Sequence, residues 1–85
     1  MATLIKASGV AETIKPDGKK FELETLQGLV GGYIEVVPIG HGECAVCDEE
    51  GKLKGKPLNI PATMMCNRAF DPFVGDIVIC KLKEI

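Results

Sequence analysis

The sequence has few of the residues from which catalytic and metal sites are usually built. Its 85 residues include one histidine, His41, and one arginine, Arg68, and its four cysteines include one closely spaced pair. His41 lies between Gly40 and Gly42, which is typical of a turn. No pattern pairs a nucleophile with a general base. We therefore expect a protein that is not an enzyme and needs no cofactor.

Long apolar runs and a basic stripe are also missing. No apolar segment approaches the roughly 18 residues needed to cross a bilayer, and the sequence shows no signal peptide. We therefore expect a cytoplasmic protein with no membrane partner. Ten basic against twelve acidic residues give a net charge of −2, which does not favour nucleic-acid binding. The length predicts a single domain over residues 1–85.

The hydrophobic fraction, 46%, is high for so short a chain. A domain of this length buries only roughly 60–65% of its unfolded surface. Part of the apolar surface is then expected to be covered by another subunit, which predicts a homo-oligomer. In a cytoplasmic protein the cysteines are expected to be reduced.

Helical signals occur twice. Leu23, Leu26, Leu29 and Val30 recur at helical spacing, which predicts a helix at about residues 23–30. The glycine pair at 31–32 follows that helix and is expected to end it, because phosphate-binding glycines precede a helix. A second short helix is predicted at about residues 60–67, with Asn59 as a possible cap and Pro61 in its first turn.

Strand signals fill most of the remaining chain. Alternation and turn residues predict strands at about residues 3–7, 10–15, 33–39, 43–47 and 76–83, with 19–22 returning against 10–15 as a hairpin. The segment 33–39 is apolar on both faces apart from Glu35, which predicts a central strand. The strand at 76–83 is expected to close the fold. The fold class is α+β, with a mainly antiparallel sheet of about four to six strands.

Two polar patterns allow more than one interpretation. Cys44 and Cys47 have the spacing of a zinc knuckle, but on a regular strand they point to opposite faces. We expect them to be structural and predict no metal site, leaving a zinc-binding module as the less favoured hypothesis. Lys52, Lys54 and Lys56 alternate along the chain and would share one face of an extended segment, either a solvated face or a charged edge strand.

Several short motifs resemble a known family. They are LQGLVGGYIEVV at residues 26–37, DEEGKL at 48–53, Pro57-Leu58-Asn59, and Val74-Gly75-Asp76. Their order and spacing resemble a small domain family of unknown function that occurs in phage and mobile-element proteins of bacteria. The resemblance implies expression inside a bacterial host cell. By analogy with other small phage proteins, it also implies an accessory or anti-defence role.

The polar residues that a purely structural role explains least well are Glu35, Asn59, Asn67, Arg68 and Tyr33. An arginine with an asparagine and a tyrosine nearby is suited to hold a phosphate or a base edge. The competing interpretations are a helix cap for Asn59 and a structural ion pair between Glu35 and Arg68. We therefore hypothesise a host-defence antagonist that sequesters a nucleotide-derived ligand. The alternative is an interaction or scaffold domain that binds a host protein.

Overall fold

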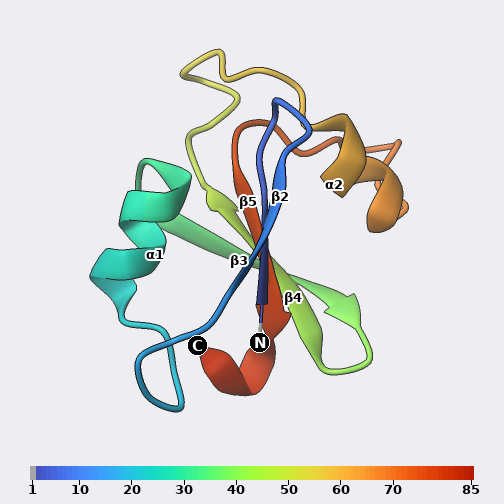
Figure 1. The fold of residues 1–85 in the computed structure, drawn as a ribbon. Coiled ribbons are helices and arrows are strands. Elements are labelled where there is room, and N and C mark those ends of the chain that lie inside the picture. Colours follow the sequence, from blue (N-terminus) through green and yellow to red (C-terminus); the bar gives the residue numbers. More distant parts are fainter. Residues whose placement is uncertain (1) are drawn as a thin grey trace.

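The computed structural model describes residues 2–85, and these form one antiparallel sheet of five strands with two helices (Figure 1). The strand order is β2-β1-β5-β4-β3, so the last strand of the chain lies in the middle of the sheet. This confirms the α+β prediction. The strands are β1 (Ala2–Ile5), β2 (Ala11–Ile14), β3 (Ile34–Gly40), β4 (Glu43–Asp48) and β5 (Ile77–Lys81); the helices are α1 (Leu23–Val30), α2 (Ile60–Met65) and the 3₁₀ turn η1 (Leu82–Glu84).

The two helices cover opposite faces of the sheet, as Figure 1 shows. Alternate residues of each strand point to opposite faces, and β4 and β5 are buried on both. Cys44 and Val46 belong to the core beneath α1, whereas Ala45 and Cys47 belong to the core beneath α2. The prediction that Cys44 and Cys47 point to opposite faces is therefore confirmed.

The first helix spans Leu23–Val30, as predicted. Leu26 and Val30 are its buried residues and pack on the sheet. Gly31 ends the helix in the left-handed conformation, with φ of 83°, and its N–H donates to the carbonyl of Gln27 at 2.8 Å. This geometry favours glycine because a Cβ is strained at positive φ.

Three strand predictions are wrong. The strand β3 lies at an edge of the sheet and not at its centre. Residues 19–22 form no strand, and the partner of β2 is β1. Burial of Phe21 draws this segment away from β2, and the N–H of Phe21 donates to the carbonyl of Glu84 at 2.7 Å. The last strand ends at Lys81, where the chain turns into η1, and not at the predicted Lys83, and it lies in the centre of the sheet.

The second helix begins after Asn59, as predicted, but ends two residues before position 67. Asn67 has φ of 54°, which stops the helix. The N–H of Arg68 then donates back to the carbonyl of Thr63 at 2.9 Å. Among residues 2–85, no helix is long and apolar enough to span a membrane.

Asn59 joins three parts of the fold from a fully buried position. Its side-chain oxygen accepts from the N–H of Ala62 at 3.1 Å, which confirms the predicted helix cap. Its amide donates to the carbonyls of Ile5 at 2.9 Å and Gly75 at 2.8 Å. One side chain thus fixes α2 against the end of β1 and the turn before β5.

Replacing this side chain should destabilise the whole domain. Asn59→Ala leaves two buried carbonyls and one helix N–H without partners, so we expect the free energy of unfolding to fall by about 3 kcal/mol or more. Urea denaturation at pH 7 measures this. The other asparagine provides the control: Asn67 is exposed with positive φ, so Asn67→Gly should change stability by less than about 0.5 kcal/mol. Equal losses in the two variants would contradict the role assigned to Asn59.

Candidate functional site

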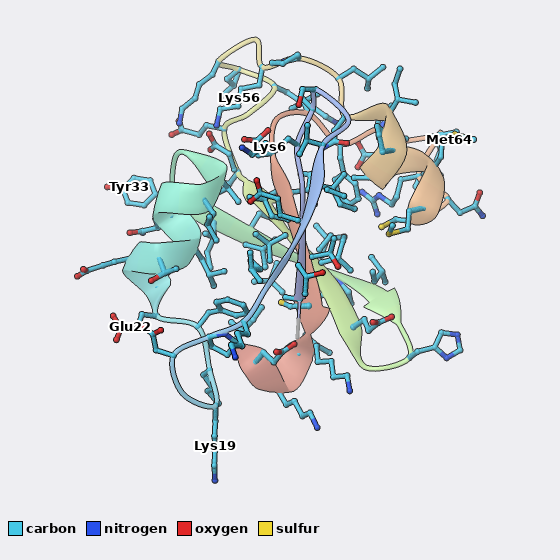
Figure 2. All side chains as sticks on the ribbon, in the orientation of Figure 1. Lys6, Lys19, Glu22, Tyr33, Lys56 and Met64 are labelled. Carbon is cyan, nitrogen blue, oxygen red and sulfur yellow. The ribbon has the colours of Figure 1, made fainter. Side chains whose placement is uncertain are left out.

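The structure brings two of the five predicted site residues together and separates the others. Arg68 and Glu35 line one cavity of about 140 Å³. Asn67 adjoins Arg68 but is exposed, and Asn59 is buried with its side-chain groups bonded within the fold. Tyr33 is 67% exposed beside α1, on the far side of the molecule from Met64 of α2 (Figure 2).

The guanidinium of Arg68 is held by two aromatic rings and one carboxylate. Its central carbon lies 5.2 Å from the ring centre of Phe70 and 5.1 Å from that of Phe73. One terminal nitrogen, Nη2, donates to Asp71 at 2.8 Å. The Nε atom is buried and has no hydrogen-bond partner in the described part of the chain. A buried donor without an acceptor costs about 1–3 kcal/mol, so an acceptor from outside this chain would stabilise the arrangement.

The Arg68 cavity carries more negative than positive side chains. Four carboxylates line it against two cations, namely Glu35, Asp48, Glu49 and Asp71 against Lys52 and Arg68. The ion pair with Lys52 holds the pKa of Asp71 below its usual range. This lining repels a phosphate but accepts a neutral ligand or a single hydrogen-bond acceptor. A cavity of roughly 150 Å³ holds a group as large as one six-membered ring.

The three alternating lysines stabilise the fold through acidic partners. Their segment consists of turns and not of an extended strand, so the prediction of a charged edge strand is wrong, whereas Lys52 and Lys54 are exposed to solvent. Lys52 pairs with Asp71, and Lys54 and Lys56 each approach the carboxylate of Asp48 to 2.8 Å. The same two lysines also donate to carbonyls at the end of α1, Lys54 to Gly31 at 3.2 Å and Lys56 to Val30 at 2.6 Å. Cations at a helix C-terminus are stabilising.

The cysteines are free, and burial disfavours their ionised form. Burial raises the pKa of Cys47 to about 11, with the Glu35 carboxylate adding to the effect. Burial likewise raises the pKa of Cys80 to about 12. Cys44 and Cys80 face each other across β4 and β5, with their sulfurs 3.8 Å apart. Within residues 2–85 no three His, Cys, Asp or Glu side chains are grouped to hold a metal ion. Thiols of this kind are poor nucleophiles.

A basic site that the sequence analysis missed lies at the other end of the molecule. It is a pocket of about 610 Å³, here called the lysine pocket, and is lined by Lys15, Pro16, Gly18, Lys19, Lys20, Lys81, Lys83 and Glu84. None of the ion pairs formed among residues 2–85 uses one of these five lysines. The contact between Phe21 and Glu84 joins the two segments. The adjacent pair Lys19-Lys20 was the one sequence signal available.

Comparison with known proteins identifies a family. A family model described as a domain of unknown function, DUF3846, matches residues 3–84. The chain belongs to the DUF3846 family. Neither the curated proteins nor the solved structures gave a match. The resemblance to a family of unknown function is therefore confirmed, and the motifs at residues 26–37 and 74–76 fall inside the matched DUF3846 segment.

In this DUF3846 domain Asp48 should couple stability to pH. Burial acts to raise the pKa of its carboxyl group, but hydrogen bonds from Lys54, Lys56 and the N–H of Glu50 outweigh burial and hold that pKa well below its usual value. A lowered folded pKa adds stability that is present above the unfolded pKa of about 3.9 and is lost as the pH falls below it.

We therefore expect Asp48→Asn to lower the free energy of unfolding by about 2 kcal/mol at pH 7, because a neutral amide weakens two charge-assisted contacts. The loss should shrink as the pH approaches 3. Urea denaturation between pH 3 and pH 7 measures both effects. Asp17→Asn, in an exposed turn, should behave as the wild type. A deficit for Asp48→Asn that is independent of pH would contradict the ionic role.

Proposed function

We propose that this domain is a non-enzymatic binding protein that sequesters a nucleotide-derived ligand, and that the lysine pocket holds the ligand's phosphates. The observation that carries the proposal is the convergence of five lysines, from two distant segments, on one concave site of about 610 Å³. That volume lies within the range of roughly 300–1,000 Å³ typical of small-molecule sites. Lysine ammonium groups are established phosphate-binding groups, acting as point charges.

The charge distribution favours a compact anion over a polymer. The chain has ten basic and twelve acidic residues. Five of the basic residues and one of the acidic residues line the lysine pocket. The remainder therefore carries five basic against eleven acidic residues. A nucleic acid running past the pocket would meet this acidic surface, whereas affinity for such a polymer depends on many phosphate contacts. A small phosphorylated ligand fits within the basic region.

Both the setting of this function and its non-enzymatic character are part of the proposal. In this proposal the domain acts inside a bacterial host cell, as its resemblance to phage and mobile-element proteins implies, and sequestering a nucleotide signal there would antagonise a defence pathway. The site chemistry supports binding rather than turnover, because Cys47 and Cys80 have raised pKa values. His41 lies at the exposed tip between β3 and β4.

A second candidate function, binding of a host protein, is favoured by one observation. Three large apolar side chains of α2 are exposed, Ile60, Met64 and Met65, and the exposed Leu58 lies just before the helix. Methionine is enriched at protein interfaces, and exposed apolar patches often mark interaction sites. This surface is distinct from the lysine pocket, so the two candidates can be tested separately.

The ligand proposal predicts that charge removal in the lysine pocket weakens nucleotide binding. Calorimetric titration against a panel of linear and cyclic nucleotides should identify a ligand. Lys19→Gln/Lys20→Gln should then weaken it about tenfold, because two exposed charged contacts contribute roughly 0.7 kcal/mol each. The affinity should also fall as salt is raised.

Two further variants make the titration specific. Lys6→Gln removes a lysine outside the pocket, one that pairs with Glu12 at 3.8 Å, and should leave affinity unchanged. Arg68→Ala tests whether the guanidinium holds the phosphate, as the sequence analysis expected. Loss of binding in Arg68→Ala but not in the lysine variant would move the site to the Arg68 cavity. No binding of any nucleotide by the wild type would favour the protein-interaction function.

A further inference from the structure

The edge strand β3 has the residue pattern of a central strand. Ile34, Val36 and Pro38 point to the α1 face, and Val37 and Ile39 to the α2 face, since side chains alternate along a strand. Val36, an apolar residue that favours strands, is 38% exposed. An edge strand of a soluble domain is usually protected by charges, by proline or by a bulge. In β3 the proline and the bulge lie at its C-terminal end, at Pro38–Gly40, and Glu35 is the only charged residue of the strand. This pattern is explained if another strand covers the edge.

The outward backbone groups of β3 can be assigned from one hydrogen bond. The N–H of Glu49 donates to the carbonyl of Tyr33 at 3.0 Å. Bonded and non-bonded residue pairs alternate in an antiparallel ladder, so Glu35 and Val37 also turn their backbone groups towards β4. Ile34, Val36 and Pro38 therefore present theirs to the open edge, where proline, which lacks an N–H, is tolerated.

We propose that two copies of this chain pair antiparallel through β3, centred on Val36, and that Glu35 of each copy accepts a hydrogen bond from Arg68 of the other. The two Val36 residues then exchange both backbone bonds, and each Ile34 N–H donates to the Pro38 carbonyl of the second copy. On the α1 face the apolar side chains of both strands form one continuous strip. This pairing is independent of the proposed nucleotide ligand.

Charge and proline together select this register. A register centred on Glu35 would place the two Glu35 carboxylates directly opposite each other, which is destabilising. A shift in the other direction would set Val36 against Pro38, and the missing proline N–H would remove one bond from each central pair. Centring on Val36 places Glu35 of one copy beside Val37 of the other, so the two Glu35 carboxylates are not opposite each other. It also keeps both backbone bonds of the central pair, and the missing proline N–H affects only the outer pairs of Ile34 with Pro38.

This register delivers an acceptor to the Arg68 cavity. Val37 lines that cavity together with Arg68, so a carboxylate arriving beside Val37 enters the region where the Nε atom lacks a partner. Glu35 itself takes part in none of the ion pairs among residues 2–85. In a single copy the cavity is lined by its own Glu35, yet the Nε atom of Arg68 has no hydrogen-bond partner among residues 2–85. Because the exchange is mutual, the Glu35 of the second copy takes the place of the cavity's own Glu35 and the number of carboxylates there stays the same.

Sedimentation velocity of the full chain from about 1 to 100 µM tests the pairing. The wild type should approach twice the chain mass of 9.1 kDa. Val36→Lys sets two like charges opposite each other at the centre and should remain monomeric, with far-UV circular dichroism confirming that it folds. Val10→Lys, at an exposed position outside β3, should dimerise as the wild type. A monomeric wild type at 100 µM, or a dimeric Val36→Lys, would overturn the proposal.

A double-mutant cycle tests the exchanged contact. Glu35→Gln and Arg68→Gln should each raise the dimer dissociation constant roughly a hundredfold, tenfold for each of the two symmetric contacts. If the two residues interact, the combined variant should weaken the dimer little more than either single variant. Independent, additive effects would show that Glu35 does not reach Arg68 and would overturn the exchanged contact.

Discussion

The buried side chain of Asn59 is the interaction on which the positions of the second layer depend. It holds the start of α2 against β1 and against the turn before β5 through three hydrogen bonds. Further hydrogen bonds connect the helix to the segment that follows it. The Thr63 hydroxyl accepts from the N–H of Phe73 at 2.9 Å, and its carbonyl accepts from the N–H of Arg68. The orientation of Arg68 between Phe70 and Phe73 thus follows from a polar contact about two turns away.

The residue pattern of a short segment correctly predicted those features of the fold that depend only on interactions within that segment. The bounds of α1, the cap at Asn59 and the opposite orientations of Cys44 and Cys47 all follow from residue spacing or from one side-chain bond. Which strand lies next to which depends instead on distant segments. The residue pattern of β3 indicates that both of its faces are apolar, but it does not indicate how many strands lie beside it. A strand at the edge of the sheet was therefore predicted to be central. The predicted hairpin at 10–22 failed because Phe21 packs into the core beside Glu84.

The site residues divide in the same way. Glu35 was identified because it is the one charged residue in an apolar strand, and Arg68 because it is the only arginine in the sequence. Lys19 and Lys81 form part of one pocket only after the fold brings the two segments together. The lysines at 52, 54 and 56 seemed to share one face, but Asp48 and Asp71 redirect them in a turn. In both cases, the lysine pocket and the three alternating lysines, residues distant in sequence determine where the lysine side chains lie.

The two proposed surfaces lie on different parts of the sheet, and this has a consequence for function. The lysine pocket adjoins the end of β2 and the end of β5, whereas pairing of copies uses β3 at the opposite edge. A paired molecule would keep both lysine pockets open, and each would bind its own ligand without competition from the interface. Pairing would instead satisfy the Arg68 donor, which is buried without a partner in one copy. On these two proposals, assembly would account for the unpartnered Nε atom of Arg68 beside an acidic cavity, and the lysine pocket would account for binding of an anion.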